Sequence, residues 1–295
     1  MVELSIIIVS YNTEEFLKAC LQSVPALENP TLEIIVVDNA SEDGSAEMVQ
    51  KEFPKVILLE NKINVGYSKG NNLGIKKAQG RYLLFLNPDT LVNKHALLEL
   101  FHFMQLHGDA GASTCSVQLP DKTLDDACHR GFPTPWNAFC HFSGVTKLFP
   151  RSRLFAGYSM GFEDLSKVHE IDALAGAFMF VRREAGEAVG WWDEDFFWYG
   201  EDLDFCYRLK QKGYKIYFVP SASIIHYKGV SGGIKKHSQE FSTASEETKK
   251  RATLARFEAM KIFYRKHYMN KYPAPITWLV NKGIDLKLWF MLRTL

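Results

Sequence analysis

Residues 81–89 read Arg81-Tyr-Leu-Leu-Phe-Leu-Asn-Pro-Asp89, an apolar run that ends in two polar side chains around a proline. A short apolar run bounded by turn residues is typical of a strand that is covered on both faces. Two similar runs lie upstream, Leu4-Ser-Ile-Ile-Ile-Val-Ser10 and Glu33-Ile-Ile-Val-Val-Asp38. We therefore predict three buried strands, each with polar residues at its carboxyl end.

Helical patterns alternate with these strands. Apolar residues recur at helical spacing over residues 14–24, and further helical patterns begin at Ser41, at Gly70 and at Glu201. Additional buried runs lie at residues 56–60, 173–182 and 215–219. This alternation predicts an α/β fold with a Rossmann-like, mostly parallel sheet flanked by helices. Residues 117–170 are interrupted by four prolines and are interpreted as a long insertion or lid.

The composition excludes several classes of protein. The chain has 295 residues, 46% of them hydrophobic, and a net charge of +1. It is therefore neither disordered nor a dedicated nucleic-acid binder, which usually carries a clear basic excess. The five cysteines form no C-x-x-C pair, so we expect reduced thiols and a cytoplasmic protein. The apolar run 4–9 is too short for a signal peptide, and no uncharged apolar window is long enough to span a membrane.

Charge divides the chain into two parts. Residues 235–295 contain 13 lysines and arginines against 5 aspartates and glutamates, whereas residues 1–234 are net acidic. We predict an α/β domain over 1–234 and a basic, amphipathic helical tail over 235–295. Two interpretations of the tail stay open. It lies peripherally on the inner face of the cell membrane, or it packs on the domain or in a homo-oligomer interface.

Polar residues follow three of the predicted strands, where ligands of such sheets bind. They are Ser10-Tyr11-Asn12, Asp38-Asn39 and Asn87-Pro88-Asp89. A carboxylate such as Asp89 suits Mg²⁺, which completes its coordination shell with substrate phosphates. Asp38 suits a ribose hydroxyl or a base N–H. The alternative is that these residues are ordinary turn and helix-start residues.

Three further segments are candidates for chemistry. Glu201 and Asp202 follow the aromatic run 196–199, so one of them can act as a desolvated general base, although acids also cap helices. His226 becomes a credible metal ligand only beside Asp89. The segment 64–72 is rich in glycine and asparagine and can cradle phosphates through backbone amides, with Lys69 adding charge. Walker and G-x-G-x-x-G motifs are absent, which argues against a dehydrogenase.

Taken together, these segments resemble glycosyltransferase family 2, and within it the rhamnosyltransferase-like enzymes of bacterial surface polysaccharides. The resemblance covers residues 3–230 and is carried by Ser5-Ile-Ile-Ile-Val-Ser-Tyr-Asn12, Val36-Val-Asp-Asn-Ala-Ser-Glu-Asp-Gly-Ser45, Asn64-Val-Gly66, Gly70-Asn-Asn72, Leu84-Phe-Leu-Asn-Pro-Asp89, Gly176-Ala-Phe-Met179 and Gly200-Glu-Asp-Leu-Asp-Phe205. It implies a GT-A fold, a nucleotide-diphosphate sugar as donor, and Mg²⁺ or Mn²⁺ as cofactor.

The resemblance also assigns roles to residues. Asp89 takes the last position of the family's D-x-D-type metal motif, in which Asn87 replaces the first aspartate, and His226 completes the metal site. Asp202 is the implied base, with Glu201 as its neighbour. The implied donor-binding residues are Ser10, Tyr11, Asn12, Asp38, Asn39, Gly66, Lys69, Asn72, Asn87 and Asp89.

The function implied is that of an inverting, metal-dependent glycosyltransferase in cell-surface polysaccharide synthesis. The preferred donor is dTDP-rhamnose, with another UDP-, GDP- or dTDP-sugar as the alternative, and the acceptor is a glycan or a lipid-linked glycan. A nucleotidyltransferase is disfavoured because the segment after the first strand, residues 10–15, is acidic rather than basic and glycine-rich. A non-catalytic relative that only binds sugar nucleotide is the remaining alternative.

Overall fold

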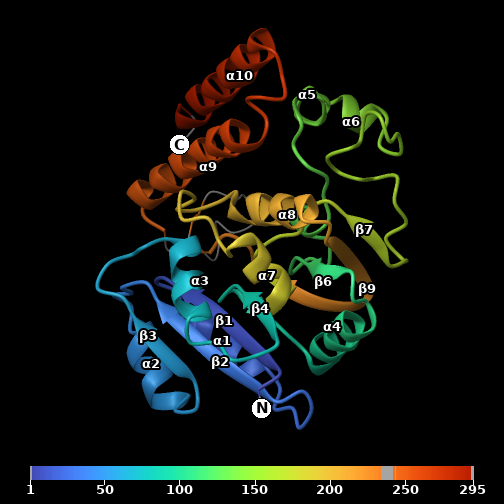
Figure 1. Cartoon of the computed structure of the whole chain (residues 1–295). Helices are drawn as coiled ribbons and strands as arrows, with labels where there is room; N and C mark the ends of the chain where they lie inside the picture. Colours follow the sequence, from blue (N-terminus) through green and yellow to red (C-terminus); the bar gives the residue numbers. More distant parts are fainter. Residues whose placement is uncertain (1, 231, 234–241, 243, 294–295) are drawn as a thin grey trace.

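The computed structural model describes residues 2–230, 232–233, 242 and 244–293. Its described residues form a nine-stranded sheet with helices packed around it (Figure 1). The strand order is β3-β2-β1-β4-β8-β6-β9-β5, and β7 pairs with β9.

The first half of the sheet is parallel, as the sequence predicts. It contains β1 (Leu4–Ser10), β2 (Leu32–Asp38), β3 (Ile57–Glu60) and β4 (Tyr82–Leu86), connected through α1 (Glu14–Ser23), α2 (Ser45–Glu52) and α3 (Tyr67–Ile75). The register places Ser10 opposite Asp38 and Ile8 opposite Leu86. The carboxyl ends of the three strands therefore meet at one edge of the sheet.

The second half of the sheet is mixed. It contains β5 (Thr90–Leu91), β6 (Ala110–Gln118), β7 (His169–Ile171), β8 (Phe178–Arg182) and β9 (Lys215–His226), with α4 (Lys94–Leu106), α7 (Arg183–Val189) and α8 (Glu201–Gln211). Here β8 runs antiparallel to β4 and β6, whereas β6 and β9 are parallel. The sequence does not predict β6, because its small and polar residues lack the apolar run of a buried strand, although most of it is buried.

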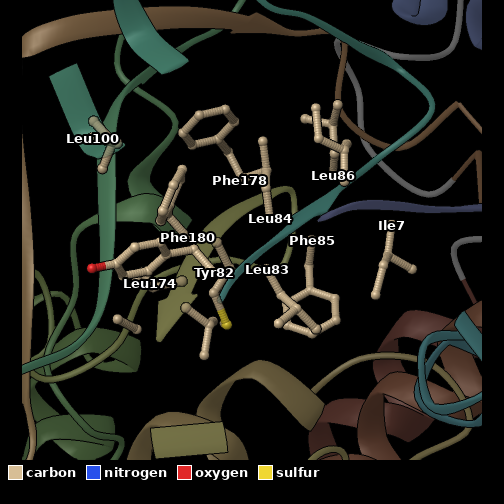
Figure 2. Packing of buried hydrophobic residues seen from close by; sticks show 14 of the residues in the cluster. Ile7, Tyr82, Leu83, Leu84, Phe85, Leu86, Leu100, Leu174, Phe178 and Phe180 are labelled. Atoms are coloured by element: carbon tan, nitrogen blue, oxygen red, sulfur yellow. The ribbon is translucent and has the colours of Figure 1, made fainter. Parts of the chain in front are cut away.

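The core is centred on β4, whose five residues are all buried. Figure 2 shows its side chains projecting to both faces of the sheet, with Leu84 and Leu86 on the side of Phe178 and Phe85 on the other. Phe85 makes an edge-to-face contact with Trp192, at 4.8 Å between ring centroids. Burial on both faces holds the strand ends, and therefore the polar residues that follow them, in fixed positions.

Between β6 and β7 lies the insertion that the prolines predict. It contains the short 3-10 helix η1 (Asp126–Cys128) and the helices α5 (Pro135–Phe142) and α6 (Val145–Leu148). Figure 1 shows α5 and α6 at the end of the molecule opposite the N-terminus.

Two helices follow at the C-terminal end, α9 (Glu246–His267) and α10 (Ala274–Leu292). A second apolar cluster, centred on Phe196, Tyr207 and Phe263, packs α9 against the segment around α8. Asp204 of α8 also accepts a hydrogen bond from His267 of α9, at 2.7 Å. Packing on the domain is thus what the structure shows for α9, whereas the predicted domain boundary at 234/235 lies outside the described residues. Of the helices described, none is both long enough and apolar enough to cross a membrane.

Candidate active site

Pairing of β5 with β9 brings Asp89 and His226 together. Thr90 lies opposite His226 in the register, and the backbone amide of Tyr227 donates to the carbonyl of Asp89 at 2.9 Å. In consequence, Oδ1 of Asp89 lies 3.3 Å from Nε2 of His226, and both residues are buried. Two residues 137 positions apart along the chain thus become neighbours through a two-residue strand.

A second carboxylate holds the opposite side of the imidazole ring. Nδ1 of His226 donates to Oδ2 of Asp125 at 3.0 Å, and Asp125 is fully buried. The Lys228 ammonium pairs with Asp125 and also with Asp126. A hydrogen bond at Nδ1 fixes the orientation of the ring and leaves Nε2 facing Asp89, as carboxylate partners do for metal-binding histidines.

The charges in this cluster reinforce one another. Burial alone would lower the pKa of His226, but the neighbouring carboxylates of Asp89 and Asp125 raise it to about 9. Burial alone would raise the pKa of Asp89, but the charge of His226 outweighs this effect and lowers it. The pKa of Asp125 falls for the same reason, because His226 and Lys228 both stabilise its charged form.

The pair fits a divalent cation, which would displace the proton from Nε2 of His226 on binding. His226 Nε2 is buried and, among the described residues, has no hydrogen-bond partner, although it lies close to the Asp89 carboxylate. Imidazole nitrogen and carboxylate oxygen together suit metals such as Mn²⁺. Over the described ranges, no group of three or more His, Cys, Asp or Glu side chains is arranged to hold a metal. A cation here would therefore need phosphate oxygens of a bound substrate to complete its shell.

Asp202 lies in the first turn of α8 and is paired with an arginine that the sequence did not single out. Nη2 of Arg130 donates to Oδ2 of Asp202 at 2.5 Å, and both side chains are mostly buried. Arg130 follows η1 and is held by two backbone hydrogen bonds to Ala173, of 3.2 and 2.9 Å. The charge of Asp202 outweighs the effect of burial and raises the pKa of Arg130. The ion pair holds the Asp202 side chain at a fixed position.

Glu201 differs from Asp202 although the two are adjacent. Burial and then the charge of Asp202 raise the pKa of Glu201 to about 8, and its Oε2 has no hydrogen-bond partner. Glu201 is therefore mostly protonated at neutral pH and cannot accept a proton there. Of the two acids, Asp202 is the one that suits a general base.

This difference predicts a pH effect on stability. The folded pKa of Glu201 lies above its unfolded value of 4.5. The folded state therefore holds a proton that the unfolded state loses, so stability falls as pH rises from about 4.5 to about 8. Glu201→Gln should remove this slope and raise the free energy of unfolding at pH 8 by roughly 2 kcal/mol or more. Urea unfolding of both proteins between pH 5 and 8 checks it, and parallel pH curves for the two would contradict it.

Tyr67 is hydrogen-bonded to the segment 174–177. Its hydroxyl donates to the carbonyl of Gly176 at 2.9 Å. Burial, and then the charges of Glu201, Asp202 and Asp89, raise the pKa of this phenol. On either side of Gly176 along the chain, the Leu174 carbonyl accepts from Arg130 at 3.4 Å and the Ala177 carbonyl accepts from the Asn87 amide at 3.0 Å. The structure pairs Asp89 with His226 and Asp202 with Arg130, and the roles of these residues remain predictions.

The strand ends of β1 and β2 provide the rest of the candidate donor site. Asp38 is buried. Its Oδ2 accepts from the Ser41 amide at 2.9 Å, and its Oδ1 is buried without a hydrogen-bond partner among the residues that the structure describes. Ser10 is buried and Tyr11 is half-buried beside it. Asn12 has a left-handed backbone with φ of 51°, and its side chain accepts from the Glu42 amide at 2.8 Å. Asn12 therefore links two loops.

The segment 64–72 departs from the expected phosphate cradle. The Gly66 amide donates to the side chain of Asn64, and the Tyr67 amide donates to the carbonyl of Phe197, both at 2.9 Å. These two amides are therefore already bonded within the protein. A Cβ on Gly66 would lie 2.6 Å from the Phe197 carbonyl, so the glycine allows two backbone segments to approach. Lys69 is exposed at the surface.

Two asparagines of the predicted donor site also make structural contacts. Asn72 donates to the Trp192 carbonyl and to Glu194, both at 2.9 Å, and accepts from the Trp192 amide. Asn39 donates to the Gly66 carbonyl at 3.1 Å. These bonds join α3 to its neighbours. Asn87 stands at the end of β4, where its backbone carbonyl accepts from Thr90 Oγ1 at 2.7 Å.

The sequence missed Asp125, Arg130 and Tyr67. Asp125 and Arg130 lie in the irregular insertion, where no periodic pattern shows which way a side chain points. In the sequence, the one feature that points to these two residues is the polar cluster Asp125-Asp126-Ala-Cys-His-Arg130 within the segment that the prolines mark as a long insertion or lid.

Comparison with known proteins places these features in a family. The model of the family "Glycosyl transferase family 2" matches residues 5–165, which is more than half of the chain. Rhamnosyltransferase WbbL of Escherichia coli K12 is 27% identical over 75% of this chain and 82% of its own length. An N-acetylglucosaminyl-diphospho-decaprenol L-rhamnosyltransferase of Mycobacterium tuberculosis is 24% identical over 99% of this chain and 93% of its own. The hexosyltransferase Agl10 of Haloferax volcanii is 27% identical over 77% and 68%.

Solved structures share the fold. The mannosyltransferase PcManGT of Pyrobaculum calidifontis, in complex with GDP-Man and Mn²⁺, has a TM-score of 0.53 at 16% identity, over 99% of this chain and 82% of that one. GalNAc-T7 with UDP, GalNAc and Mn²⁺ has a TM-score of 0.57 at 18% identity, and the match spans 77% of this chain but only 44% of that one. These neighbours are glycosyltransferases of the GT-A fold, which this chain shares.

Proposed function

Because this chain belongs to glycosyltransferase family 2 and is a glycosyltransferase, we propose that it transfers rhamnose from dTDP-rhamnose with inversion and with a divalent metal. The proposed acceptor is a glycan carried on a lipid in cell-surface polysaccharide synthesis. The observation that supports the proposal is the pair of buried charge clusters, Asp89 with His226 and Asp202 with Arg130. Segment 174–177 is hydrogen-bonded both to Arg130 and to Asn87, two residues before Asp89.

The relatives support the donor and the acceptor to different degrees. Two of them are named rhamnosyltransferases, and the mycobacterial name specifies a sugar on a polyprenyl diphosphate as acceptor. The Haloferax relative is named only as a hexosyltransferase, which keeps another nucleotide-diphosphate sugar as the alternative donor. A lipid-linked acceptor would place the enzyme at the cytoplasmic face of the membrane.

In the proposed mechanism, Asp202 accepts the proton of the acceptor hydroxyl as its oxygen forms a bond to the anomeric carbon. The bond between that carbon and the donor phosphate breaks at the same time, and its electron pair leaves with the nucleotide diphosphate. Arg130 acts through Asp202 as a positioning residue, because its guanidinium holds Oδ2 of the carboxylate, while Oδ1 accepts from the Leu203 amide at 2.7 Å. Attack from the side opposite the leaving group inverts the anomeric centre.

Asp89 and His226 would hold the cation, and when bound it would stabilise the charge that develops on the leaving diphosphate. Asp125 fixes the imidazole so that Nε2 is directed toward that position. The free Oδ1 of Asp38 would accept from the nucleoside, since it is a buried acceptor without a partner at the strand end.

Release of nucleotide diphosphate tests the proposal. We expect turnover with dTDP-rhamnose, Mn²⁺ and polyprenyl-diphosphate N-acetylglucosamine, and little turnover with UDP- or GDP-sugars. Faster turnover with another donor would replace rhamnose while retaining the reaction. Binding of dTDP without turnover of any donor would instead support the non-catalytic alternative.

A further inference from the structure

The helix α10 exposes apolar side chains to solvent. None of its described residues is buried, and Trp278, Leu279, Leu286 and Trp289 are 46% to 61% exposed. At 100° per residue, these four fall in a sector of about 100° together with Lys282 and Arg293. We call these six residues the α10 outer face. The opposite side packs on α9, where the hydroxyls of Tyr264 and Thr277 lie 3.1 Å apart.

This arrangement reverses the usual pattern. A surface helix normally turns its apolar stripe toward the core and its charged side toward water. In α10 the stripe with two tryptophans faces outward, so some partner other than the protein's own core is needed to cover it.

The insertion adds to the same end of the molecule. Lys287 of α10 lies 3.3 Å from the ring centroid of Phe142 in α5. Trp136, Phe139 and Phe142 of α5 are all exposed. Figure 1 shows α5, α6 and α10 together at the end opposite the N-terminus. Exposed aromatic side chains of two segments that are distant in sequence are therefore gathered at one end.

The charges at this end are positive. Residues 135–155 contain Lys147, Arg151 and Arg153 and no acidic residue, and of these three Arg153 is paired with Glu163 at 3.2 Å. Asp285, the single acidic residue of α10, pairs with Lys261 of α9 at 2.7 Å. Tryptophan with flanking lysine and arginine is the composition that binds the interface of an anionic bilayer. A second copy of this chain would bring like charges together on this surface.

We infer that the α10 outer face and the exposed aromatic residues of α5 bind the surface of an anionic lipid bilayer, without crossing it. The proposed active site at the start of α8 would then lie close to the membrane. Leu288 of α10 lines a groove of about 400 Å³ together with Phe197, which is four residues before Glu201. Apolar side chains supply the insertion and basic side chains the attraction to headgroups.

Co-sedimentation with vesicles tests this inference. The full chain should bind vesicles of phosphatidylcholine and phosphatidylglycerol, bind pure phosphatidylcholine more weakly, and lose affinity at high salt. The affinity of the double variant Trp278→Gln/Leu286→Gln for the anionic vesicles should be lower by ~10-fold or more. The matched control Ile63→Gln/Leu106→Gln changes two exposed apolar residues outside these segments and should bind like the wild type.

Two outcomes would overturn the inference. One is equal vesicle binding by the α10 variant and the wild type. The other is that the wild type does not bind vesicles but forms a concentration-dependent dimer in analytical ultracentrifugation, and that the α10 variant does not form this dimer. A second copy of the chain would then be the partner of the α10 outer face. The vesicles contain no donor or acceptor sugar, so these results are independent of the proposed transfer reaction.

Discussion

Replacing Asp202 with asparagine should lower kcat by ~10²- to 10⁴-fold, the usual contribution of a general base. The amide keeps the shape of the side chain but cannot accept the proton of the acceptor hydroxyl. Donor and metal binding should change little, because Asp202 is paired with Arg130 and not with Asp89 or His226. Steady-state kinetics with a saturating acceptor, and binding of dTDP by calorimetry, measure the two quantities separately.

Asp195→Asn is the matched control. It makes the same chemical change in an exposed carboxylate whose ion pair with Lys266 lies at the surface, where such pairs contribute little to stability. We expect wild-type kcat for it. If Asp202→Asn turned over as fast as this control, Asp202 would be removed from the mechanism, and the base would have to be sought elsewhere around Tyr67.

Asp89→Asn should lower kcat/KM by ~10³-fold or more, because charge stabilisation by a bound cation is worth several kcal/mol. The change removes the anionic partner of His226 at 3.3 Å. It should also abolish the rise in thermal stability that we expect Mn²⁺ with dTDP to give the wild type, since a ligand stabilises only a protein that binds it. Differential scanning fluorimetry measures this shift without any turnover.

Asp125→Asn should have a smaller effect on activity than Asp89→Asn. Asp125 touches Nδ1 of His226 and not the position between His226 and Asp89. Loss of such an outer partner typically costs ~10- to 100-fold in metal affinity or activity. Higher Mn²⁺ should therefore restore much of the activity of Asp125→Asn but not of Asp89→Asn. Equal losses that no metal concentration restores would show that the cluster is structural only.

Local sequence was sufficient for much of the molecule. The strands ending at Ser10, Asp38 and Leu86 are continuous apolar runs, and their burial and direction follow from that pattern alone. Parallel strands end at the same edge, so the position of the polar residues after them was also predictable. For segment 64–72 the local sequence predicted a phosphate cradle, but in the structure the Tyr67 amide donates to the Phe197 carbonyl. The sequence could not show this bond, because Phe197 belongs to a distant loop.

The partners that give these residues their chemistry come from far along the chain. Asp125 is 101 residues from His226, and Arg130 is 72 residues from Asp202. Both lie in an irregular insertion whose side-chain directions have no period to reveal them. The sequence by itself therefore determined which acids stand at the strand ends. Tertiary packing decided how the two acids at the start of α8 differ, because burial and the charge of Asp202 raise the pKa of Glu201, whereas Asp202 is paired with Arg130.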